Sequence, residues 1–324
     1  MIQNGFAWAA SSFRCNGGVP GYGLLDTLRL KEMFTTIAGG KRPTRTYLIG
    51  TSMGGGATLL AAHLIPTTFA GHLAMCPVVT PERGDFAVSV AFAAEAISGV
   101  SLRATPTDAD IARMRDVLGT PANYTDKGQQ LASVQITLSG GPRPFAIEGL
   151  VSRFEANILA GIGSTVALNA ATNQNTRYAL DERFGLSAAN LNKQVRRKPP
   201  DATLRGPNSP YLEVSALNGR IQRPLMTVHG TGDLQVPISG QRVLRQLVEK
   251  AGKGHLLVQR IMRIPAHCQF SDEEQIQAFD DLVKWVTDGK RPDGDDVMGD
   301  LTDAGRRFTN PLRPGDPGIV NLTR

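Results

Sequence analysis

The sequence is poor in cysteine and histidine, with three cysteines and five histidines among 324 residues. Three cysteines are too few for a disulfide framework. Cys15, Cys76 and Cys268 can form one disulfide bond with one thiol left over, or none, and the sequence does not choose. No cysteine and histidine residues cluster at the spacing of zinc ligands, so we do not expect a structural zinc site.

Long apolar runs are also missing. None approaches the roughly 20 residues needed to cross a bilayer, and the first residues lack the basic and then apolar pattern of a secretory signal. Hydrophobic residues nevertheless make up 41% of the chain, which is enough for a sizeable core. We therefore expect a globular protein of one large or two modest domains, without a membrane span.

The net charge of +6 has no concentrated source in the sequence. Basic residues are scattered except for the run Arg196-Arg197-Lys198, and no nucleic-acid-binding motif surrounds that run. A short basic run before Pro199-Pro200 is typical of a solvated surface loop. Nucleic acid is therefore not an expected partner.

The most informative stretch that is present is Gly50-Thr51-Ser52-Met53-Gly54. It follows an apolar run and leads into a small-residue helical pattern, which predicts a strand, a sharp turn and a helix with Ser52 at the apex. Side chains two residues before and two residues after the serine are expected to collide with the crossing strand and helix. Gly50 and Gly54 meet that requirement, and Ser52 is a candidate nucleophile.

A serine nucleophile needs an imidazole to take its proton and a carboxylate to orient that imidazole. Asp233 lies in a loop just past the apolar strand 224–229. His267 lies in a loop about one strand-helix-strand unit later, before the next helix. The order along the chain is therefore serine, aspartate, histidine.

On these residues the chain resembles an α/β-hydrolase, and within that superfamily a serine esterase. The resemblance covers residues 5–80 and 222–290. It implies a parallel sheet flanked by helices, with Ser52, Asp233 and His267 as the catalytic triad and the Met53 backbone N–H as an oxyanion donor. It implies neither a cofactor nor a metal.

The pair His267-Cys268 is similar to the His-Cys pair of tannase and feruloyl esterase relatives. In those relatives a second cysteine precedes the nucleophile and bonds to the one after the histidine. Thr51 occupies that position here, so that bond cannot form. Cys268 is then either part of another bridge that stiffens the histidine loop or a small buried hydrophobe.

The organisation along the chain follows from the hydrophobic periodicity. Strands alternate with helices in both outer parts of the chain, which predicts a catalytic core formed by residues 1–80 and 222–290. Between them, residues 81–221 read as a mostly helical cap inserted over the active-site face, and residues 291–324 as an irregular tail. The expected helices are 22–38, 53–64, 86–99, 107–118, 145–160, 239–251 and 272–288, and the expected strands are 6–12, 46–50, 71–79, 224–229 and 256–261.

Ser271 and Glu274 predict a capping box at the start of the last of these helices. That helix start leaves His267 in the preceding loop, free to reach Ser52.

The N-terminal strands of an α/β-hydrolase sheet have no counterpart before residue 6, and the strand that normally separates 6–12 from the elbow strand is missing. Either the sequence is a fragment or has a miscalled start, and another chain completes its sheet as a homo-oligomer or a partner, or residues 6–18 take the missing role with Cys15-Asn16-Gly17-Gly18 near the oxyanion. The second oxyanion donor is therefore unassigned.

Several residues compete for the same roles. Asp85 is an alternative acid, but Asp233 lies one unit before His267 and is preferred. The other histidines occupy a helix or strand ends, and only His229 among them is placed to line the site. These histidines are His63, His72, His229 and His255.

Aromatic residues form either an acyl pocket or, more often at helical spacing, the core of the cap: Trp8, Phe86, Phe92, Phe145 and Phe154.

The predicted activity is hydrolysis of a small or polymeric carboxylic ester, with aromatic-acid or polyester-like esters as the expected class from the esterase resemblance. The same triad also serves peptidases, thioesterases and acyltransferases, and a hydrolase fold can act as a non-catalytic binding module.

Overall fold

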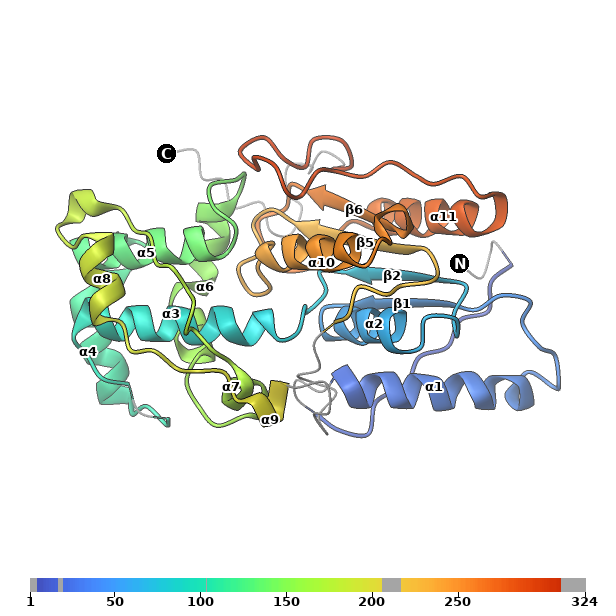
Figure 1. Cartoon of the computed structure of the whole chain (residues 1–324), viewed down its shortest axis with the longest axis horizontal. Coiled ribbons are helices and arrows are strands. Elements are labelled where there is room, and N and C mark those ends of the chain that lie inside the picture. Colours follow the sequence, from blue (N-terminus) through green and yellow to red (C-terminus); the bar gives the residue numbers. More distant parts are fainter. Residues whose placement is uncertain (1–4, 17–19, 103, 206–216, 310–324) are drawn as a thin grey trace.

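The computed structural model describes residues 5–16, 20–102, 104–205 and 217–309. Its centre is a parallel sheet of four strands in the order β1-β2-β5-β6 (Figure 1). The strands are β1 (Tyr47–Thr51), β2 (Gly71–Met75), β5 (Leu225–Gly230) and β6 (Leu257–Met262). Their carboxyl ends point toward the helical half of the molecule, so the loops that follow them meet at one edge.

Strands β2, β5 and β6 are buried along their whole length, as expected for a parallel sheet covered on both faces. Alternate side chains of each strand enter different cores. Leu225 and Leu257 pack on the side of helices α2 (Met53–Leu64) and α10 (Ser239–Lys250). Met226 and Val258 pack on the opposite side, against α11 (Asp272–Asp288). The predicted parallel sheet flanked by helices is confirmed.

Helix α1 (Pro20–Ile37) lies against α2 at the outer side of the sheet (Figure 1). Helix α11 begins where the sequence predicts. The Ser271 hydroxyl accepts a hydrogen bond from the Glu274 backbone N–H, and the Glu274 carboxylate accepts one from the Ser271 N–H at 2.9 Å. This capping box fixes the end of the loop that carries His267.

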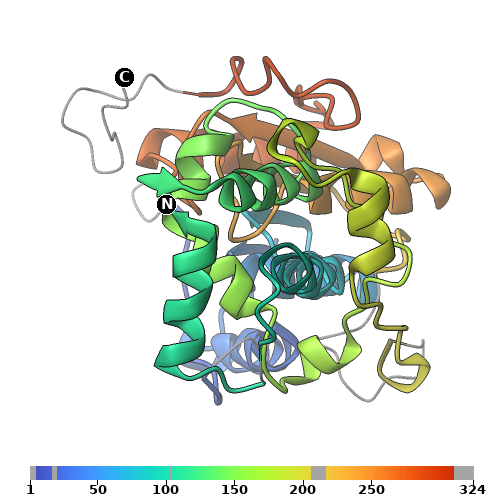
Figure 2. The same cartoon turned by 90° about the vertical axis from the view of Figure 1, so that its left-hand side faces the viewer.

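Residues 82–205 form a helical insertion beside the carboxyl ends of the strands, and Figure 2 looks onto it with the sheet behind. Its longest helix, α3, lies at the centre of a separate apolar core. A two-stranded hairpin, β3 (Gly119–Thr120) with β4 (Asn123–Tyr124), joins two of its helices. The helices are α3 (Glu82–Ser98), α4 (Asp108–Leu118), α5 (Asp126–Leu138), α6 (Ala146–Ala160), α7 (Val166–Ala170), α8 (Ala188–Gln194) and α9 (Ala202–Arg205), with short 3-10 turns at Glu182–Phe184 and, outside the insertion, Gly254–Leu256.

The structure departs from the expected elements in several places, and the helices α7, α8 and α9 and the β3–β4 hairpin were not expected. The predicted strand 6–12 is wrong, because these residues hydrogen-bond to no neighbouring strand and form no strand. Strand β2 ends at Met75 rather than at residue 79, because Cys76 leaves the extended conformation with a φ of 39°. Helix α5 was not expected. Its buried Gln130 and Gln135 interrupt the apolar pattern from which a helix is recognised.

Strand β1 is an edge of the described sheet. A cavity of about 860 Å³ lies beside it, lined by residues 5–11, part of α1, residues 41–51 and part of α11. From the segment expected to take the role of a missing strand, residues 6–11 and Phe13 line this cavity. Gly17 and Gly18 of that segment lie outside the described residues. No helix in the described part of the chain has the length and apolar character that a membrane crossing requires.

Candidate active site

Ser52 lies at the apex of a sharp turn between β1 and α2. Its φ of 55° is in the left-handed region, which non-glycine residues rarely adopt. The turn is held by the Ser52 N–H, which donates to the Met75 carbonyl at 2.9 Å, and by the Ser52 carbonyl, which accepts from Val78 at 3.2 Å. The strained serine therefore stands at the carboxyl end of the sheet, between β1 and the end of β2.

Only one of the two flanking glycines is required by close packing. A Cβ on Gly50 would overlap the Gly54 carbonyl and lie 2.6 Å from the Thr58 hydroxyl oxygen. A Cβ on Gly54 would meet nothing within 4 Å, so the expected collision at that position is wrong. The second close approach is instead at Gly55, where a Cβ would lie 2.9 Å from the Met75 carbonyl oxygen.

Ser52, His267 and Asp233 lie in one hydrogen-bonded chain. The Ser52 Oγ is 2.7 Å from His267 Nε2, and His267 Nδ1 is 2.6 Å from Asp233 Oδ2. With the proton on Nδ1, His267 donates to the carboxylate and accepts from the serine hydroxyl. The three residues come from loops after β1, β5 and β6, whose strand ends meet at one edge of the sheet.

Asp233 is completely buried, and its second oxygen is satisfied by the backbone. Oδ1 accepts hydrogen bonds from the N–H groups of Gln235 at 3.0 Å and Val236 at 2.9 Å. These bonds fix the carboxylate, so that Oδ2 is directed at His267. A buried carboxylate held in this way can orient an imidazole and stabilise its positive charge.

The rival histidines have other surroundings. The His63 Nδ1 accepts a hydrogen bond from Gly219, and His72 lies buried at the opposite end of β2. His229 is next to the site, with Nε2 2.9 Å from the Val236 carbonyl and 3.9 Å from Asp233 Oδ2. Burial lowers the pKa of His229, which favours its neutral form. His229 therefore packs beneath the acid and does not contact Ser52.

Asp85, the alternative acid, is engaged elsewhere. Its carboxylate pairs with Arg205 and accepts a hydrogen bond from the Thr172 N–H at 2.8 Å. This pair joins α3 to the end of the helical insertion. Asp85 is therefore not a partner of His267.

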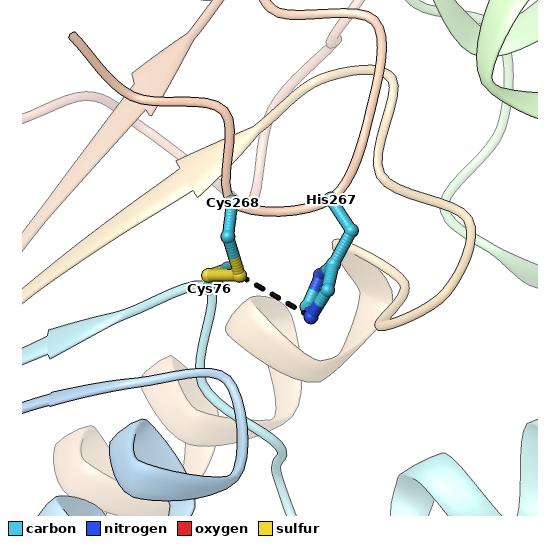
Figure 3. Close-up of side chains that lie close together, drawn as sticks. All are labelled: Cys76, His267 and Cys268. Atoms are coloured by element: carbon cyan, nitrogen blue, oxygen red, sulfur yellow. Dashed lines mark hydrogen bonds between the residues drawn. A yellow bond between two sulfur atoms is a disulfide. The ribbon is translucent and has the colours of Figure 1, made fainter.

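Cys268 is bonded to Cys76, a pairing that the sequence left open (Figure 3). The two residues are 192 positions apart, with their Cα atoms 5.6 Å apart. Thr51 is paired with Met75 in the sheet, so Cys76 comes one position later, beside Ser52. The disulfide thus ties the end of β2 to the residue after His267, while Cys15 is free and exposed.

Cys76, His267 and Cys268 have potential metal-ligand atoms within 4.8 Å of one another. The Cys268 Sγ is 3.2 Å from His267 Nε2 (Figure 3). Both sulfurs are used in the disulfide, and metal binding by cysteine requires a thiolate. The cluster in this state does not fit a metal site.

Three arginines of the helical insertion interact with Asp233 or its loop, and the sequence analysis did not identify them. Arg143 is buried and donates from Nε to the Thr231 carbonyl at 2.6 Å, which ties the α5–α6 loop to the acid loop. Burial lowers the pKa of Arg143 to about 10. Arg83 and Arg153 also interact electrostatically with Asp233. Scattered arginines carry no local sequence signal, because only the fold brings them together.

Comparisons with known proteins give only structural matches, since no protein-family model and no curated protein matches the sequence. Two esterases are among the solved structures to which the chain is similar. Feruloyl esterase B from Aspergillus oryzae matches at 13% identity and a TM-score of 0.45, over 83% of this chain and 64% of its own. An esterase from Aspergillus oryzae matches at 12% identity and a TM-score of 0.46, over 83% and 63%.

A peptidase is also among the matches. The Pyrococcus horikoshii acylaminoacyl peptidase matches at 13% identity and a TM-score of 0.37, over 86% of this chain and 30% of its own. The chain thus spans less than two thirds of the length of these structures.

Proposed function

We propose that this chain is a serine hydrolase that cleaves carboxylic esters through an acyl-enzyme intermediate. The observation that carries the proposal is the contact of 2.7 Å between Ser52 Oγ and His267 Nε2, with Asp233 at 2.6 Å on the other side of the imidazole. A hydroxyl, an imidazole and a buried carboxylate in this order are the arrangement that activates a serine.

In the proposed mechanism, His267 takes the hydroxyl proton as Ser52 Oγ attacks the ester carbonyl carbon. The Met53 backbone N–H, at the start of α2, is proposed as one oxyanion donor, and a single such donor is worth roughly 3 kcal/mol. The imidazolium, held by Asp233, returns the proton to the leaving alcohol as the C–O bond breaks. Water then attacks the acyl-enzyme in the same way, releasing the acid and restoring Ser52.

The helical insertion is proposed to act as a cap that selects the substrate. A Cβ on Gly149 of α6 would overlap the Gly232 carbonyl and lie 3.0 Å from the Pro265 carbonyl oxygen. Helix α6 therefore packs directly against both the acid loop and the histidine loop. On the resemblance of His267-Cys268, aromatic-acid or polyester-like esters are the proposed substrate class.

The test is a series of p-nitrophenyl esters, from acetate to long acyl chains, assayed with the wild type, Ser52→Ala and Ser101→Ala. Ser101 is an exposed serine outside the site and serves as the matched control. We expect turnover by the wild type and the control, and loss of about a thousandfold or more in kcat for Ser52→Ala. Turnover that survives in Ser52→Ala would remove this serine from the mechanism, and an inactive wild type would favour a binding module.

A further inference from the structure

Two arginines of the helical insertion lie on elements that adjoin the candidate active site. Arg83 is in the first turn of α3, five residues after Val78, whose N–H donates to the Ser52 carbonyl. Arg153 is one helical turn after Gly149, the residue at which α6 contacts the acid loop, so both lie on one face of α6. Each interacts electrostatically with Asp233, and Arg83 also with Arg153.

Neither guanidinium is neutralised by an ion pair. Within the described ranges no carboxylate lies within salt-bridge distance of Arg83 or Arg153. The Arg153 Nε is buried and has no hydrogen-bond partner. The contact of Arg83 is with the Phe86 ring, whose centroid is 5.9 Å from the guanidinium carbon.

The other arginines of the insertion differ from this pair. Five of the other described arginines pair with a carboxylate, and Arg143 and Arg197 bond to backbone carbonyls. Arg177 has no carboxylate partner among the described residues either, but it is exposed. The five pairs are Arg113–Asp110, Arg115–Glu155, Arg183–Asp181, Arg196–Glu95 and Arg205–Asp85. Among the described arginines of the insertion, only Arg83 and Arg153 are therefore partly buried without a carboxylate or a backbone carbonyl as partner.

The two arginines carry positive charge at neutral pH. Burial and, to a lesser extent, the neighbouring Arg153 lower the pKa of Arg83 to about 10, so this guanidinium remains protonated at neutral pH. Burial likewise lowers the pKa of Arg153. Partly buried charges of the same sign are costly without a counter-charge. Both residues are also partly exposed.

We propose that Arg83 and Arg153 form an anion subsite for a carboxylate on the substrate, so that the chain prefers esters bearing a negative charge. Guanidinium groups recognise carboxylates through paired charge-assisted hydrogen bonds. The subsite rests on the proposed ester hydrolysis, because the bound carboxylate would place the ester next to Ser52. It narrows the substrate class from esters in general to acidic esters.

The experiment compares each anionic ester with its neutral methyl ester. Mono-p-nitrophenyl glutarate carries the charge on the acyl part, and 4-acetoxybenzoate carries it on the alcohol part. The measured quantity is the ratio of kcat/KM for the anionic ester to that for its methyl ester. In the double variant Arg83→Gln/Arg153→Gln we expect this ratio to fall about tenfold or more for at least one pair.

Two kinds of control accompany this measurement. Arg220→Gln removes the same charge at an exposed position and should leave the ratio unchanged. Arg83→Lys and Arg153→Lys keep the charge and should keep part of the preference, and they replace the double variant if it fails to fold. Added salt should reduce the wild-type ratio, because the attraction is electrostatic.

The outcomes separate the two proposals. A wild type that hydrolyses neutral esters, but shows no anionic preference in either pair, would overturn the subsite and leave the esterase proposal standing. A wild type that hydrolyses neither the anionic esters nor the neutral esters would overturn the esterase proposal. The subsite is then decided by calorimetric binding of mono-p-nitrophenyl glutarate and its methyl ester to Ser52→Ala, with and without the arginine substitutions. Equal binding in all four combinations would contradict the subsite.

Discussion

Gly50 and Gly54 flank Ser52 symmetrically in the sequence, but their surroundings in the structure differ. The space beside Gly50 is filled by the backbone of the following helix turn, whereas the space beside Gly54 is open. The two glycines look equally constrained in the sequence, but close packing excludes a side chain only at Gly50. The difference follows from the way α2 leaves the turn.

This asymmetry predicts opposite results for two identical substitutions. Gly50→Ala forces the Cβ into the Gly54 carbonyl and should cost about 1–3 kcal/mol in the free energy of unfolding. Gly54→Ala, in the first turn of α2, should be neutral or should stabilise by up to about 1 kcal/mol, because alanine favours the helix. Urea unfolding of the two variants measures the difference. Equal destabilisation by both would show that the space beside Gly54 is not open.

At the scale of elements, the Cys76–Cys268 disulfide joins the end of β2 to the loop between β6 and α11. His267 is the neighbour of a bonded cysteine, so the bond limits how far the imidazole can move from Ser52. The residue before the serine is Thr51, which cannot form a disulfide. Cys76, directly after the adjacent strand β2, tethers the histidine loop instead.

Removing this bond should affect stability and activity together. Cys76→Ser is expected to lower the free energy of unfolding by about 2–5 kcal/mol, because the bond closes a long loop. It should also lower kcat on p-nitrophenyl esters, since the loop that carries His267 is no longer tethered. Cys15→Ser is the matched control, because Cys15 is exposed and unbonded. Full activity in a stably folded Cys76→Ser variant would argue against a positioning role for the bond.

At the scale of the whole molecule, two histidines are buried at the far end of β2 from the site. They are His63 and His72. Burial lowers the pKa of each to about 4. In the unfolded chain their pKa values lie near the ordinary 6.5, so the unfolded state binds more protons between about pH 6.5 and pH 4. Stability is therefore fully present above this window and falls as the pH decreases through it.

The expected loss is about 3 kcal/mol for each histidine, at 1.36 kcal/mol per pKa unit. Glu82 acts in the opposite direction, because burial raises its pKa to about 7 and stabilises its protonated form. Because the two contributions to the pH dependence of stability oppose each other, a histidine variant is needed to isolate the contribution of the histidines. His72→Phe keeps an aromatic ring and removes one titration, so its free energy of unfolding should fall less than that of the wild type between neutral pH and about pH 4. Parallel pH profiles for the two proteins would contradict this assignment.

Strand β1 lies at an edge of the described sheet, which bears on the assembly of the whole molecule. The expectation that another chain completes the sheet stays a prediction, because only the cavity beside β1 bears on it. Covering that edge would pair the backbone groups that an edge strand leaves open.

Local signals made much of the core predictable. Helix α2 and helix α11 begin and end where the sequence indicates, because an elbow turn and a capping box mark their starts. Helix α5 was missed because its buried polar residues, Gln130 and Gln135, interrupt the apolar period. Gln135 instead accepts a hydrogen bond from Asn157 of the neighbouring helix α6. Strand 6–12 was wrongly expected, because an apolar segment forms a strand only beside a partner.

The sequence by itself determined the order of serine, aspartate and histidine and the placement of each in a loop after a strand. In a parallel sheet the carboxyl ends of the strands lie at one edge, so these residues could be expected to meet. Only the tertiary structure decided that Cys76 bonds to Cys268, and that Arg83 and Arg153 interact electrostatically with Asp233. Such contacts depend on which strands are neighbours and how the inserted helices pack, and no local pattern encodes them.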